Sequence, residues 1–433
     1  MTLFRATVLD TPVDPFTAGP TAALLADQDA GLMVRDGVIL ARGSYAAVRS
    51  QYPQEDTVDL TGGVLLPGFV DTHVHFPQVR AIGGLGMPLL AWLEQCALPE
   101  ESRLADVDYA AGVAEDFVNG LVAAGTTSAL VFGAHFGPAM DLLFAGAERR
   151  GLNVTSGLVL SDRILRPSLL VTPEQALTAS RALIDRWHGR GRLTYAVTPR
   201  FSLSTTDAML EVCAALLTDD VRFTSHLNEN VTEIAAIADL FPRSAHYLDT
   251  YARHGLVTER SVFAHNVHPV AAELEVLAAA GAWVSHYPTS NASLGSGMFP
   301  LLEHLDAGVG VALGSDVGAG TGFFLPKEGL QAYFVQQLLG RQGLPLTPAH
   351  LLHLATRSGA LALGIADRVG DLAVGKEFDA VWVRPPAGGT LAGNLANAAD
   401  PADALARIFA LATPADIAAV WTCGRQISGD ARA

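Results

Sequence analysis

The stretch that decides the fold of this chain spans residues 66–75 and reads LPGFVDTHVH. Its apolar run predicts a β-strand that ends in His73 and His75, and residues two apart on a strand point to the same face of a sheet. Both imidazoles can therefore reach one metal ion from inside a barrel. An isolated HxH pair is weak support for a metal site, because many such pairs are structural or lie on the surface. Its companions in the sequence decide the interpretation.

Four further polar residues stand at the carboxyl ends of predicted strands. These are His226, His265, His286 and Asp316. Barrel enzymes place their active sites at this end of their strands. A structural role is the alternative for any single histidine, but it explains less as the same placement recurs. The pattern indicates one site at one end of a barrel.

Short β-rich runs alternate with alanine-rich helical stretches between residues 68 and 369. Strands that alternate with helices form a parallel sheet, and about eight such units form a barrel. We therefore expect the α/β fold class, with a (β/α)8 TIM-type barrel over residues 68–369. The clearest strand runs after the HxH strand are residues 127–132, 153–160, 193–197, 221–225, 261–264, 283–285 and 310–313.

Both ends of the chain have a different pattern. Residues 31–43 alternate apolar and polar positions around Asp36-Gly37, a dipeptide that favours a tight hairpin. Strand-like runs return after residue 370, at residues 378–383 and 417–421. We expect residues 1–67 and 370–433 to form one small β-sandwich domain beside the barrel.

The composition suits a compact enzyme. Half of the 433 residues are hydrophobic, 17% are charged, and the formal net charge is −16. This acidic balance disfavours nucleic acid and anionic membranes as partners and leaves small molecules. The three cysteines are far apart without a CxxC pair, and neither a basic leader nor an apolar span of about 18 residues occurs. We expect a cytoplasmic protein without disulfides or a membrane anchor.

The order HxH, His, His and Asp resembles the amidohydrolase superfamily. Three further stretches are similar to those of the guanine deaminases within it: Gln78 in HVHFPQ, PLLAWLE at residues 88–94 with Pro99-Glu100 after it, and TPRFSLS at residues 198–204. SHYPTSN and GSDV, at residues 285–291 and 314–317, extend the resemblance over most of residues 64–330. The chain departs from the common pattern at Asn266 and Thr289, which affects the fine shape of the expected pocket.

The resemblance implies a metal site with one ion per chain. The family's ligands match His73, His75, His226 and Asp316, and Zn²⁺ is expected, with Fe²⁺ chemically admissible. Binuclear relatives add a carboxylated lysine on strand four, but this chain has no lysine before Lys327. The resemblance also gives catalytic roles to three residues: Glu229 as the proton shuttle, with His265 and Asp316 assisting the attack.

The resemblance further implies guanine as the substrate, with xanthine and ammonia as products, and a homodimer. The expected substrate contacts are Gln78, Leu90, Trp92, Arg200, Phe201, His226 and Glu229. Arg200 offers a charged donor to a carbonyl oxygen, although a structural salt bridge would satisfy it equally. Trp92 and Phe201 offer flat apolar surface, but aromatic residues beside leucines are more often core. Glu229 by itself could be an ordinary acidic residue at a helix start.

Other functions stay open at this point. A related deaminase acting on another aminated heterocycle, such as 8-oxoguanine, a triazine or an adenosine derivative, would differ only in its pocket residues. A non-catalytic amidohydrolase-like scaffold is a further alternative, but such proteins usually lack the metal ligands that this chain retains. The glycine-rich stretch at residues 314–322 lacks the ending of a phosphate loop, and the PCxxC signature of the other zinc deaminases is missing.

Overall fold

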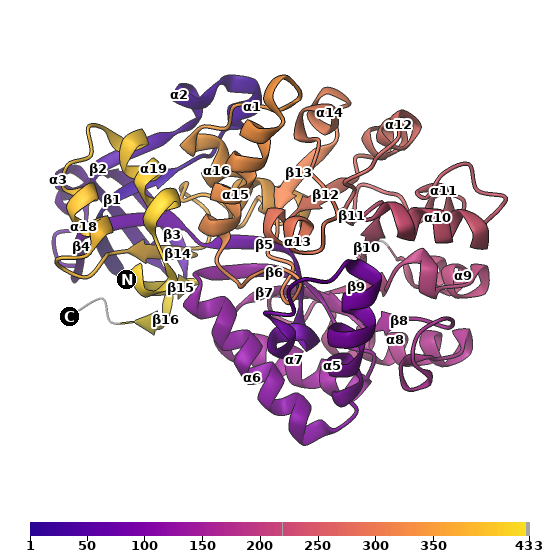
Figure 1. Ribbon diagram of the computed structural model, residues 1–433. Helices are drawn as coiled ribbons and strands as arrows, with labels where there is room; N and C mark the ends of the chain where they lie inside the picture. Colours follow the sequence, from indigo (N-terminus) through magenta and orange to yellow (C-terminus); the bar gives the residue numbers. More distant parts are fainter. Residues whose placement is uncertain (219, 430–433) are drawn as a thin grey trace.

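The computed structural model describes residues 1–218 and 220–429. Within this part, eight parallel strands follow one another in a sheet in the order β13-β12-β11-β10-β9-β7-β6-β5, and helices surround it (Figure 1). A ninth strand, β8, pairs with β9. The strands are β5 (Phe69–His75), β6 (Thr126–Phe132), β7 (Asn153–Gly157), β8 (Val159–Leu160), β9 (Leu193–Pro199), β10 (Arg222–Leu227), β11 (Ser261–His265), β12 (Trp283–His286) and β13 (Gly310–Leu313).

The sheet closes into a barrel where its first and last strands meet. The main-chain N–H of Asp316 donates to the oxygen of His73 at 2.9 Å, and the N–H of His75 donates to the oxygen of Val317 at 2.8 Å. The hydroxyl of Thr72 also donates to the oxygen of Leu313 at 2.8 Å. The predicted (β/α)8 barrel is therefore confirmed, and the HxH pair lies at its seam.

One strand differs from the prediction. The run 153–160 forms two strands, β7 and β8, and not one, because the chain bends where Gly157 passes close to β9. A Cβ atom at Gly157 would lie 1.8 Å from the main-chain oxygen of Ala196, so only glycine fits there. Beyond the bend, Val159 pairs with Thr198 near the carboxyl end of β9.

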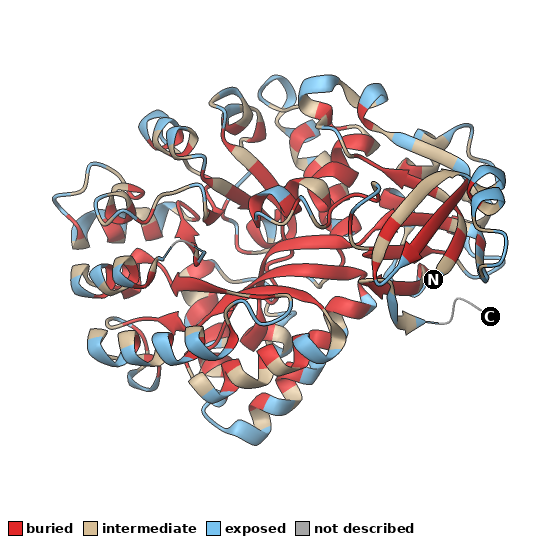
Figure 2. Cartoon of the chain, turned by 180° about the vertical axis from the view of Figure 1, so that it is seen from behind, coloured by how far each residue is buried: buried red, intermediate tan, exposed pale blue. Residues whose placement is uncertain are grey.

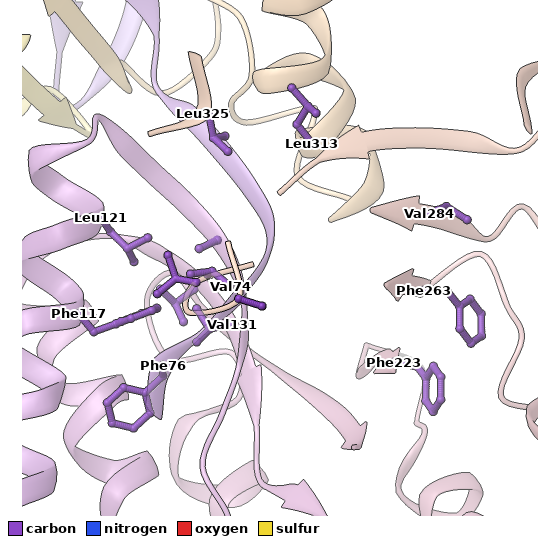
Figure 3. Close-up of a cluster of buried hydrophobic side chains, with 14 of the residues drawn as sticks. Val74, Phe76, Phe117, Leu121, Val131, Phe223, Phe263, Val284, Leu313 and Leu325 are labelled. Carbon is purple, nitrogen blue, oxygen red and sulfur yellow. The ribbon is translucent and has the colours of Figure 1, made fainter. Parts of the chain in front are cut away.

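Helices cover the outside of the barrel, and the apolar side chains on their inner faces pack against the strands. In α6, whose N-terminus is capped by Asp106, the residues Val113, Phe117 and Leu121 recur every four positions and are buried. Figure 3 shows Phe117 and Leu121 directed toward Val131 of β6. Figure 2 shows the same division over the whole chain, with buried strands in the centre and exposed outer helix faces.

The α-helices are, in chain order, α1 (Pro15–Ala18), α2 (Pro20–Ala23), α3 (Tyr45–Gln51), α4 (Leu89–Trp92), α5 (Leu98–Arg103), α6 (Val107–Ala123), α7 (Gly137–Arg150), α8 (Pro173–Trp187), α9 (Asp207–Leu216), α10 (Val231–Leu240), α11 (Asp249–Ala252), α12 (Ala271–Ala280), α13 (Pro288–Ser293), α14 (Leu301–Asp306), α15 (Leu325–Leu338), α16 (Pro348–Ala355), α17 (Arg357–Ala362), α18 (Thr390–Leu395) and α19 (Pro401–Leu411). A π-helix, η2 (Leu93–Ala97), joins α4 to α5. No helix in the described residues is both long and apolar enough to span a bilayer.

Strands from both ends of the chain form a second sheet beside the barrel (Figure 1). Its order is β16-β15-β14-β4-β1-β2-β3, with β1 and β4 parallel and the other pairs antiparallel. Its strands are β1 (Thr2–Asp10), β2 (Leu25–Arg35), β3 (Val38–Ser44), β4 (Thr57–Pro67), β14 (Ala380–Val383), β15 (Ile417–Thr422) and β16 (Arg425–Gly429).

The second sheet curls so that strands from its two halves share one core. The ring of Phe4 in β1 contacts the ring of Trp421 at a centroid distance of 5.7 Å, although β4 and β14 lie between their strands in the sheet order. The hairpin expected at Asp36-Gly37 joins β2 to β3, and both residues have positive φ angles, 51° and 83°. Of the range 370–433 expected for this part, residues 430–433 lie outside the described chain. The exact division into two domains stays a prediction.

Candidate functional site

Three buried histidines converge at the carboxyl ends of the strands. His73 and His75 extend from β5 and His226 from β10, and one ring nitrogen of each lies within 4.8 Å of the other two. The Nε2 atoms of His73 and His75 are 3.0 Å apart. Burial lowers the pKa of His73 to about 4, so its ring is neutral near pH 7 and has a lone pair to donate.

Asp316, which follows β13, adds a carboxylate to the three histidines. Its Oδ1 lies 3.4 Å from Nε2 of His73 and 3.2 Å from Nε2 of His75, and its Oδ2 accepts a 2.6 Å hydrogen bond from Ser290. Burial alone would raise the pKa of Asp316, but the two imidazoles outweigh burial and hold this pKa well below its usual range. Imidazole nitrogens and carboxylate oxygens are ligand types that Zn²⁺ and Fe²⁺ accept, so the three histidines could hold a metal ion with Asp316 beside them.

The backbone is strained around these side chains. Non-glycine residues with left-handed φ angles follow or end three barrel strands: Asn228 (48°), His265 (69°), Asn266 (47°) and Asp316 (47°). Such conformations persist only where the surrounding structure holds them, and they concentrate at functional sites. The side chains of two of these residues meet, since Oδ2 of Asp316 lies 4.0 Å from Nε2 of His265.

Glu229 and His265 form a pair beside the cluster. Oε2 of Glu229 lies 3.1 Å from Nε2 of His265, and Oε1 accepts a 3.3 Å hydrogen bond from Ser296. Nδ1 of His265 faces Oδ1 of Asn291 at 3.0 Å and donates to it, which leaves Nε2 as an acceptor. Burial, followed by the charges of Glu233 and Asp316, raises the pKa of Glu229 well above its usual range.

The helix-start interpretation of Glu229 is not supported by the local geometry. The residue that caps α10 is Asn230, whose side chain accepts from the N–H of Thr232. Glu233 completes this cap and also accepts the N–H of Glu229 at 3.2 Å. The side chain of Glu229 is 3% exposed and its carboxyl lies against His265, so it does not cap α10.

A pocket opens beside the cluster. It is lined by His75, Gln78, Leu89, Trp92, Leu93, Arg200, Phe201, His226, Glu229, His265, Leu294, Asp316 and Ala319. Most of the residues singled out from the sequence are therefore together in one place. His73 and Leu90 are not among the lining residues. Leu89 and Leu93 line it in place of Leu90, because residues four apart on the α4 to η2 segment share a face.

Arg200 lies in this pocket and also forms a buried ion pair. Its Nη2 donates to Oε1 of Glu101 at 2.7 Å, and its Nε donates to Oε2 at 3.3 Å. Burial alone would raise the pKa of Glu101, but Arg200 and then His135 hold this pKa well below its usual range. Glu101 and His135 carry no motif of their own in the sequence, and sequence reasoning missed both.

Gln78 lines the pocket, but its amide is also hydrogen-bonded to other groups of the protein. Nε2 of Gln78 donates to Oε1 of Glu101 at 2.7 Å, and its Oε1 accepts from the N–H of Gly318 at 3.2 Å.

His286, which ends β12, does not line the pocket. Its ring stacks on Phe299 at a centroid distance of 4.2 Å, and among the described residues neither of its ring nitrogens has a hydrogen-bond partner.

Comparisons with known proteins agree with this geometry. The model of the amidohydrolase family matches residues 64–427. A probable guanine deaminase of Deinococcus radiodurans is 58% identical over 431 residues, which is 98% of each chain. The solved structure of Escherichia coli guanine deaminase superposes with a TM-score of 0.96 at 33% identity, covering 99% of this chain and 100% of that one. A guanine deaminase from C. acetobutylicum, solved with guanine bound in its active site, has a TM-score of 0.91 at 26% identity over 99% of this chain and 100% of its own.

Proposed function

The chain belongs to the amidohydrolase family, and on this premise we propose that it hydrolyses guanine to xanthine and ammonia. The observation that carries the proposal is one pocket lined by His75, His226 and Asp316 of the candidate metal site together with Glu229 and Arg200. Relatives named guanine deaminase, one at 58% identity and one with guanine bound, support the choice of substrate.

His73, His75, His226 and Asp316 would hold a single divalent ion, which we assign as zinc. Nδ1 of His226 donates to the main-chain oxygen of Arg200 at 2.7 Å, so its Nε2 is left with the lone pair that a metal needs. When bound, the ion supplies Lewis acidity that lowers the pKa of water toward about 7 and so provides a nucleophile at neutral pH.

Glu229 moves the protons of the reaction. It takes a proton from the attacking water and delivers it to the ring nitrogen beside the amino-bearing carbon of guanine. The oxygen of water bonds to that carbon, and Glu229 then returns the second proton of water to the amino group. The carbon–nitrogen bond breaks, and ammonia and xanthine result. Burial, followed by the charges of Glu233 and Asp316, raises the pKa of Glu229, which favours its role as a proton donor after it has accepted the proton of water.

His265 and Asp316 hold the reacting oxygen. His265 is neutral, because burial lowers its pKa to about 3, and its Nε2 accepts a hydrogen bond from the new hydroxyl on the tetrahedral carbon. Oδ2 of Asp316 lies 4.0 Å from this Nε2, which is close enough for both groups to contact one oxygen atom of the substrate. Phe201 and Trp92 flank the purine plane, and Arg200 donates to its carbonyl oxygen.

The test is a substrate panel. Protein of measured metal content is incubated with guanine, adenine, cytosine and ammeline, and ammonia is measured. We expect ammonia from guanine with xanthine in equal amount and little from the other three. Release from one of the others and none from guanine would reject the proposed substrate. A homodimer and a cytoplasmic location stay predictions, for light scattering and cell fractionation to test.

A further inference from the structure

Glu101 is a buried carboxylate that gathers donors from three barrel strands. Its side chain is 3% exposed and accepts from Arg200 after β9 and from Gln78 after β5. Nε2 of His135, which follows β6, lies 3.2 Å from its other oxygen. The proposed proton transfers make no use of Glu101, so this arrangement needs an explanation of its own.

The ion pair fixes the plane of the Arg200 guanidinium. Glu101 binds it side-on through Nε and Nη2, and two hydrogen bonds to a planar group leave it little freedom to rotate. Nη1 has no hydrogen-bond acceptor among the described residues. This nitrogen therefore remains for a ligand in the pocket that Arg200 lines.

Glu101 also supplies the only carboxylate paired with Arg200 in the described chain. A buried guanidinium without a counter-ion is costly, and a flexible arginine would turn toward water instead. The negative charge of Glu101 thus keeps Arg200 inside the pocket before any ligand arrives. A site that is arranged in advance spends less binding energy on ordering.

The position of Glu101 in the chain adds a second connection. It lies on α5, which continues from α4 through η2, and Leu89, Trp92 and Leu93 on this segment line the pocket. The contacts of Glu101 to Arg200, Gln78 and His135 therefore attach this segment to the strand ends. Glu101 therefore helps to position both the polar side chains of the pocket, Arg200 and Gln78, and the apolar α4 to η2 segment.

We propose that Glu101 is a specificity-determining positioning residue, which acts by presenting Nη1 of Arg200 to a ring carbonyl. This inference rests on the proposed function. A ring that has a carbonyl oxygen beside Nη1 of Arg200 accepts a hydrogen bond from it. A ring that has an amino group at the same place would set one N–H donor against another. A binding site discriminates strongly against a ligand that leaves one of its buried donors unpaired.

The test compares Glu101→Gln with Glu100→Gln. Glu100 is the preceding residue on the same helix, but it pairs with Arg103 and Tyr109 and not with the pocket, so it is a matched control. Glu101→Gln should retain its metal, raise KM for guanine and Kd for xanthine by roughly 10- to 100-fold, and lower kcat less. Glu100→Gln should stay within about twofold of the wild type.

A double-mutant cycle separates positioning from a general effect on folding. If Glu101 acts mainly through Arg200, then Glu101→Gln should raise KM by a clearly smaller factor in an Arg200→Met background than in the wild type, with only the effect through Gln78 and the α4 to η2 segment left. Glu101→Asp keeps the charge and should restore part of the affinity; it replaces Glu101→Gln in the comparison if the latter does not fold.

Specific results would overturn the inference. These are an unchanged KM in metal-loaded Glu101→Gln, a loss confined to kcat, or additive effects of the two substitutions. They differ from failure of the proposed function, in which the wild-type protein itself would release no ammonia from guanine.

Discussion

Nδ1 of His226 lies 2.7 Å from the main-chain oxygen of Arg200, so a proposed metal ligand and a proposed substrate ligand are one hydrogen bond apart. The bond uses the backbone of Arg200 and orients the imidazole, while the guanidinium of the same residue pairs with Glu101. Metal binding and substrate binding therefore depend on different atoms of one residue. This separation makes their contributions measurable.

Replacing Arg200 by methionine should weaken guanine binding without removing the metal. The main-chain oxygen that orients His226 remains, whereas the guanidinium that donates to the substrate is lost. We expect KM to rise roughly 10- to 100-fold with the metal content unchanged. Steady-state kinetics and elemental analysis of the same sample check this. Loss of metal in the variant would show that the side chain, and not the backbone, supports His226.

Replacing Glu229 by glutamine should remove most of the turnover. Glutamine has nearly the same size but cannot carry the proton, and general acid–base catalysis typically contributes about 100- to 10,000-fold to a rate. We expect kcat to fall within that range, with metal content and melting temperature near those of the wild type. A kcat close to the wild-type value would remove Glu229 from the mechanism.

Removing the metal should abolish activity and reduce stability. An ion that binds the folded state and not the unfolded one stabilises the fold by about 2.7 kcal/mol at a free concentration 100 times its Kd. Dialysis against a chelator should therefore lower the melting temperature, and added Zn²⁺ should restore both properties. Protein dialysed without chelator is the control. Full activity at trace metal content would contradict the assignment.

Stability should depend on pH through Glu328, a fully buried residue of α15. Burial raises its pKa from 4.5 to about 8, against hydrogen bonds from the N–H and hydroxyl of Thr289. Between these two pH values the folded state holds a proton that the unfolded state has lost. The contribution is therefore full below about pH 4.5 and is lost as the pH rises through 8, by on the order of a few kcal/mol.

The matching measurement is urea unfolding of the wild type and Glu328→Gln from pH 5 to pH 9. The amide is neutral at every pH, so the variant should show a flatter stability profile and exceed the wild type above about pH 8. Parallel profiles for the two proteins would mean that Glu328 does not titrate in this range.

Truncating Phe117 should destabilise the barrel without altering the site. The side chain is fully buried between α6 and the strands and contacts the ring of Phe76 at a centroid distance of 5.7 Å (Figure 3). Phe117→Ala should cost about 3–5 kcal/mol in the free energy of unfolding. Val107→Ala, at an exposed position of the same helix, should change it by less than about 0.5 kcal/mol. Equal effects would mean that the buried face of α6 contributes little.

The barrel and the cluster of His73, His75, His226 and Asp316 could be predicted, because each rests on sequence patterns within a few neighbouring residues. His73 and His75 point the same way wherever residues 66–75 form a strand, and the recurrence of polar residues at strand ends needs no knowledge of distant contacts. The run 153–160 was predicted as one strand and forms two, because of a contact between residues far apart in the chain, the close approach of Gly157 to Ala196. Leu90 stays a prediction as a substrate contact, while Leu89 and Leu93 of the same segment line the pocket.

By itself, the sequence determined the alternation of strands and helices and the residues that end the strands, since both follow from side-chain periodicity along a few neighbouring residues. Only the tertiary structure decided that Glu101 pairs with Arg200, 99 positions later in the chain, and that the Glu229 carboxyl turns to His265 instead of capping α10. Such pairs form because closing the barrel buries charges that must then find partners. No spacing in the sequence encodes which partner lies across the barrel.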